Sequence, residues 1–227
     1  MRTYDVHTHI IPGIDDGAKN AKESIELLKM LKSQGISDVV LTPHYYPFEM
    51  PVKEFLARRQ RHFDEIKPAF DELDINYHLG AEVYFSDVIF AYDDLKELCV
   101  DGKNYLLLEL PFDEKNATKV INWLHKISAN YSVKIIIAHI ERYPKLFNED
   151  FLREVNEFGC LVQFDIDSLK KIFLKGKIIK YIKRGYIHLA GSDCHDLINR
   201  PPSFDLMKKN LKEDIYYYLL NIFDTLQ

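Results

Sequence analysis

Residues 133–139 read VKIIIAH, an almost unbroken apolar run that ends on a histidine. A run of this kind is typical of a parallel strand that is buried on both faces. Residues 105–110, YLLLEL, repeat the pattern with a glutamate near the end. Similar short runs alternate along the chain with segments in which apolar residues recur at helical spacing. This alternation predicts an α/β fold built on parallel strands.

The elements follow one another as strand–helix units. We expect strands at residues 4–9, 37–42, 75–83, 105–110, 133–139, 161–165 and 186–191. We expect helices at residues 18–34, 52–73, 93–99, 117–130, 149–158, 169–184 and 204–223, the second of them broken or bent near Pro68. Such a series predicts a barrel or a doubly wound parallel sheet, in a single domain that spans residues 1–227.

The composition narrows the class of protein. A formal net charge of −5 argues against a general nucleic-acid binder, which usually carries a basic excess. The 3 cysteines include no CxxC pair, so a disulfide framework is not expected and a reducing compartment fits better. The chain also lacks a signal-peptide core and an apolar stretch long enough to span a membrane. We therefore expect a soluble, cytoplasmic protein.

Side chains that bind metals gather where the predicted strands end. Barrel enzymes carry out their chemistry at the carboxyl ends of the strands. The ligand-type residues found at or just after those ends are His7, His9, His44, Glu82, Glu109, His139, Asp193 and His195, with Asp15 and Asp16 in the loop after the first strand. Each of them alone is more often structural. Their placement on one rim, without Lys or Arg at these positions, indicates a shared site.

Carboxylates crowded on one rim repel each other and lose solvation unless cations neutralise them. Histidine, aspartate and glutamate without a necessary thiolate suit Mn²⁺, Fe²⁺ or Zn²⁺ and exclude a Cys-rich structural zinc site. So many ligands exceed the needs of one ion, which predicts a cluster of two or three divalent metal ions. The remaining histidines, His62, His78, His125 and His188, fall inside predicted helices or strands and are expected to be structural.

With these residues placed, the sequence resembles the PHP (polymerase and histidinol phosphatase) superfamily over nearly its whole length. The motifs that carry the resemblance are DVHTHI, TPHYYP, GAEVYF, LLLELP, IIIAHIERYP and GSDCHDLINRPP. Within the superfamily the chain is most similar to the bacterial metal-dependent protein-tyrosine phosphatases of the CpsB/YwqE type. The resemblance implies a distorted (β/α)7 TIM-like barrel, the PHP fold.

The resemblance also implies a ligand set, with manganese as the expected metal. It assigns His7, His9, Glu82 and Asp193 to one metal, Glu82 bridging to a second with Glu109 and His139, and Asp16, His44 and His195 to a third. The spacing favours Asp16 over Asp15. Arg142 and Arg200 would bind the substrate phosphate, which the planar guanidinium fork suits, although surface ion pairs are the alternative for both.

The function that the resemblance implies is hydrolysis of phosphotyrosine on a protein, with a bacterial tyrosine kinase tail as partner in capsular or exopolysaccharide biosynthesis. A metal-bridging hydroxide would attack phosphorus while the metals and both arginines neutralise the developing charge. The alternative is a small-molecule phosphatase of the histidinol-phosphate type. A nuclease and a non-catalytic binding protein are less favoured, because of the net charge and the complete ligand set.

Three features leave alternatives open. In GSDCHDLINRPP, residues 191–202, Cys194 and Arg200 have the spacing of the Cys-x5-Arg loop of thiol phosphatases, but the loop lacks glycine and two prolines follow. We therefore expect Cys194 to be a bystander. Tyr45, in the loop at residues 45–51, is expected either to contact a phosphotyrosine ring or to pack the loop. The basic segment 169–184 is expected to be a solvated helix face, with an acidic peptide as the alternative.

Overall fold

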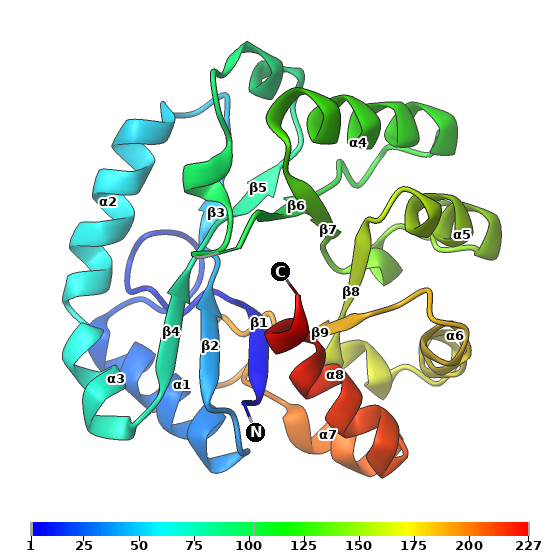
Figure 1. The fold of residues 1–227 in the computed structure, drawn as a ribbon. Coiled ribbons are helices and arrows are strands. Elements are labelled where there is room, and N and C mark those ends of the chain that lie inside the picture. The colour runs from blue at the N-terminus through cyan, green and yellow to red at the C-terminus, as the bar shows by residue number, and fades with distance from the viewer. Residues whose placement is uncertain (1, 102, 227) are drawn as a thin grey trace.

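The computed structural model describes residues 2–101 and 103–226, and Figure 1 shows parallel strands surrounded by helices. One sheet has the order β1-β2-β4 and the other the order β3-β5-β6-β7-β8-β9, and every pairing is parallel. The strands are β1 (Tyr4–Thr8), β2 (Asp38–Leu41), β3 (His44–Tyr45), β4 (Asn76–Leu79), β5 (Glu82–Tyr84), β6 (Tyr105–Glu109), β7 (Lys134–Ile137), β8 (Leu161–Asp165) and β9 (Leu189–Gly191).

The two sheets are parts of one barrel. The predicted strand 75–83 is broken at Gly80 into β4 and β5, and β2 continues as β3 after Pro43, which has no N–H to donate. Hydrogen bonds bridge the breaks, from Gly80 N–H to the Leu41 carbonyl (2.9 Å) and from Glu82 N–H to the Pro43 carbonyl (3.1 Å). β2 with β3, and β4 with β5, therefore each occupy one place in the barrel.

The barrel closes between its first and last strands. Thr8 and Cys194 form a parallel bridge. Asp193 N–H donates to the His7 carbonyl (2.9 Å), and His9 N–H donates to the Cys194 carbonyl (3.0 Å). The predicted distorted (β/α)7 barrel is confirmed.

The helices cover the outside of the barrel (Figure 1). They are α1 (Ala21–Ser33), α2 (Val52–Asp64), α3 (Lys67–Leu73), α4 (Ala117–Tyr131), α5 (Glu149–Glu157), α6 (Ile172–Lys183), α7 (Phe204–Asn210) and α8 (Glu213–Thr225), with 3-10 turns η1 (Asp87–Ala91), η2 (Lys96–Leu98), η3 (Ile140–Arg142) and η4 (Ile166–Lys170). Asparagine side chains cap the starts of α1, α4 and α5, which fixes where these helices begin.

Of the break or bend predicted near Pro68, the structure has the break: residues 52–73 form two helices, with Pro68 in the first turn of the second, where a proline is tolerated. Several other predicted boundaries were wrong. The predicted helix 204–223 is also two, α7 and α8. The predicted helix 93–99 is a 3-10 turn, and η4 delays the start of α6. The predicted strand 186–191 is shorter, and His188 lies before it.

Inside the barrel lies a compact apolar cluster. It consists of Tyr4, Val6, Val40, Val100, Tyr105, Leu107, Ile136, Ala138, Leu189 and Phe223. Phe223 comes from α8, which contacts β1 and β9, and its ring lies 5.3 Å from that of Tyr4. Because α8 covers the amino ends of these strands, the carboxyl ends are the free end of the barrel.

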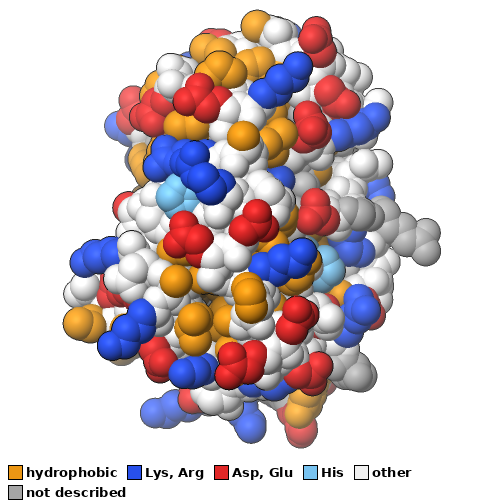
Figure 2. All heavy atoms as spheres, turned by 90° about the vertical axis from the view of Figure 1, so that its left-hand side faces the viewer, with side chains coloured by type: hydrophobic (Ala, Val, Ile, Leu, Met, Phe, Trp, Pro, Cys, Tyr) orange, Lys and Arg blue, Asp and Glu red, His pale blue; other side chains and the backbone are white. Residues whose placement is uncertain are grey.

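The surface on one side of the barrel carries mixed charge. On the face in Figure 2, which includes α2 and α3, acidic and basic side chains are interspersed, as is typical of a solvated surface. Among the described residues, we find no helix with the length and apolar character needed to cross a membrane.

Gly191 allows β9 to approach β1 closely. A Cβ there would lie 2.6 Å from the Cβ of His7 and 2.8 Å from Nε2 of Gln163. We expect Gly191→Ala to lower the free energy of unfolding by about 1 to 3 kcal/mol, measured by denaturant unfolding. Gly176→Ala in α6 is the control, because its Cβ would meet nothing within 4 Å, and alanine should stabilise that helix by roughly 0.5 to 1 kcal/mol. If both variants lost the same free energy of unfolding, the close approach of β9 to β1 would not be the cause.

Candidate metal centre

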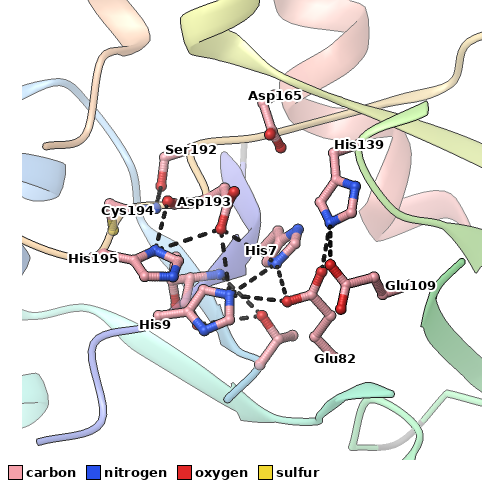
Figure 3. A network of polar contacts seen from close by, with 12 residues as sticks. His7, His9, Glu82, Glu109, His139, Asp165, Ser192, Asp193, Cys194 and His195 are labelled. Carbon is pink, nitrogen blue, oxygen red and sulfur yellow. Dashed lines mark hydrogen bonds and ion pairs between the residues drawn. The ribbon is translucent and has the colours of Figure 1, made fainter. Parts of the chain in front are cut away.

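The predicted ligand residues meet at the carboxyl end of the barrel (Figure 3). β1 supplies His7 and brings His9 just beyond its end, and β3, β5 and β6 supply His44, Glu82 and Glu109. His139 follows β7, Asp193 and His195 follow β9, and Asp16 lies in the loop after β1. All are buried except His44, which is half-buried, and Asp16, whose side chain is 67% exposed. The structure thus brings the whole predicted set together.

A bulge in β1 turns its histidines into the barrel. Tyr4 and Val6 belong to the inner apolar cluster, so strict alternation would send His7 to the outer face. The register against β2 shifts between Asp5 and Thr8, where β1 contains one residue more than its partner. An extra residue inverts the alternation. His7 and His9 therefore face inward with the other ligand-type residues.

Two of these residues have an unusual backbone. His139 has φ of 28° and Asp193 has φ of 50°, in the left-handed region that disfavours side chains. Such a conformation costs on the order of 1 to 3 kcal/mol and persists only where the surroundings impose it. Both residues lie two positions after the end of a strand, β7 and β9 respectively, and their side chains lie in the cluster at the end of the barrel.

Glu82 occupies the middle of the cluster. Its Oε2 lies 3.2 Å from Nε2 of both His7 and His9 and 2.9 Å from Nδ1 of His44. Its Oε1 lies 2.7 Å from Nε2 of His139. One carboxylate therefore faces four imidazole rings.

The other carboxylates extend the cluster in three directions. Asp193 Oδ1 lies 3.3 Å from Nε2 of His9, and Glu109 Oε1 lies 3.4 Å from Nε2 of His139. Asp16 Oδ1 lies 3.3 Å from Nε2 of His195. Three sets of ligand atoms each lie within 4.8 Å of one another and could hold an ion: His9 with Asp16, His44 and His195; His7 with His9 and Glu82; and His44 with Glu82 and Glu109.

His9, His139 and His195 are held with Nε2 turned to the cluster, whereas His44 presents Nδ1 to Glu82. His9 Nδ1 lies 2.9 Å from Asp15 Oδ2, and His195 Nδ1 lies 2.9 Å from the Asp193 carbonyl. His139 Nδ1 lies 3.3 Å from the Tyr143 hydroxyl. A hydrogen bond donated by Nδ1 leaves the lone pair on Nε2 free, which is how metal-binding histidines are usually oriented.

Some buried atoms at the centre have no hydrogen bond of good geometry within the described chain. They are Glu82 Oε2, His44 Nδ1 and His195 Nε2. Leaving such atoms without a partner is costly, and a divalent cation would satisfy all three types of donor atom. The residues present therefore fit a cluster of divalent metal ions.

The pKa values show the same demand for positive charge. Burial by itself would lower the pKa of His44 and His139, but carboxylate contacts from Asp16, Glu109 and Glu82 raise these pKa values to about 9 and about 10. Burial raises the pKa of Glu82, yet the charge of His7 and contacts with the other histidines hold it well below its usual value. Without metal, His44 and His139 hold protons that balance part of the carboxylate charge.

The structure separates the roles of the two aspartates after β1. Asp16 faces the cluster, as the spacing favours. Asp15 lies behind His9 with a buried side chain, and its carboxylate also accepts hydrogen bonds from the N–H groups of Gly17 and His44, both 3.0 Å long. Asp15 thus orients His9 and fixes the loop.

Sequence reasoning missed two residues on β8. Asp165 ends the sixth predicted strand, so the strand-end rule itself could have found it. Its Oδ2 lies 2.5 Å from Nη2 of Arg142. Gln163 Oε1 accepts from His139 N–H (2.7 Å) and lies 3.4 Å from Nδ1 of His7, while its Nε2 donates to Asp165 (3.1 Å). These two side chains join the histidines to the arginine.

Arg142 and Arg200 reach the cluster from the other side of Asp193. Both guanidinium groups contact Asp193 Oδ2, whereas Asp193 Oδ1 faces His7 and His9. Each arginine side chain is about one-third exposed, at 34% and 35%. The two arginines therefore form a cationic rim that solvent can reach.

Cys194 is separated from this chemistry. It is fully buried among apolar residues, and Figure 3 shows its sulfur pointing away from the cluster. Burial raises the pKa of its thiol, so it is a poor source of thiolate. Its backbone forms the closing bridge of the barrel, and the structure supports the expectation that its side chain is a bystander.

Tyr45 does not face the cluster as a substrate contact requires. It is buried, and its hydroxyl bonds to the Met50 carbonyl (3.0 Å) and to the Tyr92 hydroxyl (2.8 Å). Tyr46, the next residue, instead stacks on the His44 ring with centroids 5.5 Å apart. This geometry favours the loop-packing alternative for Tyr45, and Tyr46 is the aromatic residue of this loop that lies beside the cluster.

The remaining candidates are structural. His62, His78 and His188 contact a carbonyl, Asp38 and a backbone N–H respectively, and His125 packs against Phe158. In the basic segment 169–184, Lys180 and Arg184 pair with Glu149 and Lys170 pairs with Asp167. That pairing favours a solvated helix face over a docking surface.

Residues 3–220 match the family model described as capsular polysaccharide synthesis, CpsB/CapC. The chain belongs to the CpsB/CapC family.

Two curated members of the CpsB/CapC family illustrate the likeness. The chain is 31% identical to a putative tyrosine-protein phosphatase CapC of Staphylococcus aureus, over 94% of this chain and 85% of that protein. It is also 31% identical to the tyrosine-protein phosphatase CpsB of Streptococcus pneumoniae, over 90% of this chain and 89% of that protein.

Solved structures give the same fold. One comes from a study of YwqE from Bacillus subtilis and CpsB from Streptococcus pneumoniae, described as metal-dependent tyrosine phosphatases. It superposes with a TM-score of 0.78 at 23% identity, covering 98% of this chain and 93% of that one. A phosphotriesterase homology protein from Escherichia coli superposes with a TM-score of 0.56 at 12% identity, over 96% and 95% of the two chains.

The metal-free protein should become less stable as the pH rises. The raised pKa values of His44 and His139 stabilise the fold below 6.5, and this contribution disappears as the pH passes about 9 and about 10. Thermal melts of chelator-treated protein should therefore show a falling Tm between about pH 7 and about pH 10. Metal-loaded protein should change less, because bound ions keep the histidines neutral. A Tm that rises over this range in the chelated protein would contradict the assignment.

Proposed function

We propose that this chain is a metal-dependent protein-tyrosine phosphatase, a phosphoric monoester hydrolase. The observation that carries the proposal is the convergence of histidines and carboxylates on Glu82, with Arg142 and Arg200 beyond Asp193. Such a site joins positive charge for phosphoryl oxygens with ligands for divalent ions. The names of the relatives, which are tyrosine-protein phosphatases, support this choice among phosphatases.

The contacts support three metal positions. His7, His9, Glu82 and Asp193 would hold one ion, Glu82 with Glu109 and His139 a second, and Asp16, His44 and His195 a third. The third group coincides with a set of ligand atoms that includes His9 as well. Nitrogen and oxygen donors without thiolate suit manganese, iron or zinc, and of these we propose manganese. Bound divalent ions supply a hydroxide nucleophile at neutral pH and neutralise phosphoryl oxygens.

The arginines would bind and orient the phosphate. Both guanidinium forks now lie on Asp193 and are open to solvent, so an incoming phosphoryl group can take their free N–H donors. Asp165 holds Arg142 from behind, and Gln163 holds Asp165. A phenolate leaves more readily than an alkoxide, because the pKa of a phenol such as the tyrosine side chain is about 10 and that of an aliphatic alcohol is higher. A tyrosyl ester therefore depends less on a general acid.

The family supports a proposal for the wider role of this chain. We propose that residues 1–227 act as one PHP-type metallophosphatase domain in the cytoplasm on a phosphotyrosine protein, with a bacterial tyrosine kinase tail as the partner. The family description links its members to capsular polysaccharide synthesis. The three cysteines, all free and buried, agree with a reducing compartment. The alternative is hydrolysis of histidinol phosphate. It is less favoured because the similar proteins are named tyrosine-protein phosphatases.

Activity on three substrates tests this proposal. Manganese-loaded protein should hydrolyse a phosphotyrosine peptide with a higher kcat/KM than histidinol phosphate, and single-stranded DNA should remain intact. Chelation should abolish the activity, and added manganese should restore it. A preference for histidinol phosphate would instead select the small-molecule alternative, and activity that survives complete metal removal would exclude the metal mechanism.

Substitutions at two neighbouring residues distinguish the metal from the thiol. Cys194→Ser should keep most of the activity, although a hydroxyl in this apolar position should lower stability by about 1 to 3 kcal/mol. Asp193→Ala should lose at least about 100-fold in kcat/KM, because it removes a contact of both arginines and of the histidines. Metal content is measured for each variant. If the Cys194→Ser variant were inactive but had normal metal content, that result would instead favour a thiolate nucleophile at Cys194.

A further inference from the structure

Aromatic side chains gather beside the candidate metal centre. Tyr46 and Phe48 follow β3, Tyr84 ends β5, and Phe112 follows β6. We name these four residues the aromatic wall. Phe48 is 58% exposed and Phe112 is 53% exposed, while Tyr46 and Tyr84 are half-buried. Single exposed aromatic residues are common on protein surfaces, so the case depends on how these four are arranged.

Three of the rings form one cluster. The ring centroids of Tyr46 and Tyr84 are 5.7 Å apart, and those of Tyr46 and Phe48 are 5.9 Å apart. Phe48 meets Tyr84 edge-on at 6.1 Å, with an interplanar angle of 89°. These distances lie within the range in which aromatic pairs attract each other. The rings therefore support one another and present a shared apolar surface.

The aromatic wall adjoins the ligand residues at two places. Tyr46 stacks on the His44 ring, with centroids 5.5 Å apart. Phe112 lies almost parallel to the His139 ring, at 6.0 Å and 20°, and to Tyr143, at 5.6 Å. Between these places, Tyr84 pairs with Glu109 across β5 and β6. The wall thus flanks the Glu109 side of the centre.

The charged groups for phosphate lie elsewhere. Arg142 and Arg200 contact Asp193, and Figure 3 shows Asp193 and Glu109 on different sides of Glu82. A phosphomonoester has one charged end and one ester group, and this centre has a cationic rim and an apolar surface to match. A phosphoryl group held at the arginines and the centre leaves its ester group to face the aromatic wall.

We propose that the aromatic wall is the subsite for the ring of an aryl phosphomonoester and that it makes this site select aryl over alkyl esters. The proposal rests on the proposed function, because it names the part of the same site that recognises the tyrosyl ring. Ring stacking is tolerant of small differences in position and adds attraction beyond area burial. The exposed faces of Phe48 and Phe112 are the surfaces that a substrate ring can cover.

Two phosphonates that the enzyme does not hydrolyse measure this selectivity without turnover. Phenylphosphonate and methylphosphonate share the charged group and differ in the ring. Calorimetry on manganese-loaded protein should give a Kd for phenylphosphonate about tenfold lower than for methylphosphonate. In Phe48→Ala combined with Phe112→Ala, the difference should fall to about twofold or less, because the ring contacts are lost.

Controls separate this effect from damage to the site. Phe158→Ala removes a ring that is 44% exposed, at the end of α5, and should leave both Kd values unchanged. Metal content is measured in every variant, because Phe112 contacts His139. Among the described ring pairs, the Phe48 ring contacts only Tyr46 and Tyr84. The single substitution Phe48→Ala should therefore reduce the selectivity without affecting a ring contact of His139.

The outcomes distinguish this proposal from the proposed function. Equal Kd values for the two phosphonates in the unaltered protein, or a preference that survives the double substitution with normal metal content, would overturn the aromatic subsite. Loss of affinity for both phosphonates alike would also overturn it, since that result reports damage to phosphate binding. Failure to hydrolyse a phosphotyrosine peptide, with the selectivity for phenylphosphonate intact, would contradict the proposed substrate and not the subsite.

Discussion

The carboxylate of Glu82 lies among the imidazoles of His7, His9, His44 and His139, and the rest of the site depends on this contact. A buried carboxylate without compensating charge would cost several kcal/mol. The fold therefore has to bring positive charge to this point, either as protons on the histidines or as metal ions. The barrel brings the histidines to this point because the carboxyl ends of its parallel strands all lie at the same rim.

The backbone departs from regular strand geometry at several places around this site. The bulge in β1 breaks the register with β2 so that His7 and His9 face inward. His139 and Asp193 adopt positive φ angles two residues beyond the ends of their strands. Gly191 lets β9 approach His7 closely enough for the barrel to close. Each departure from regular strand geometry lies at the site, where orientation of ligand atoms matters more than local stability.

Asp193 connects the two halves of the chemistry. One of its carboxylate oxygens faces the histidines and the other contacts both arginines. A change in what occupies the centre can therefore alter the position of the two guanidinium groups. Asp165 and Gln163 limit that movement, because they tie Arg142 to the residues that hold His7 and His139.

The sequence by itself determined the parallel α/β class, the identity of the ligand-type residues and the end of the barrel at which they meet. It could do so because apolar runs such as residues 133–139 mark buried strands, and parallel strands align their ends. Strand breaks at Pro43 and Gly80, and the bulge in β1, depend on partners that the local sequence does not contain. Only the tertiary structure decided that Asp16 faces the cluster while Asp15 supports His9, and that Tyr46 replaces Tyr45 beside it. Adjacent residues point in different directions, and contacts from distant segments select which of them reaches the site.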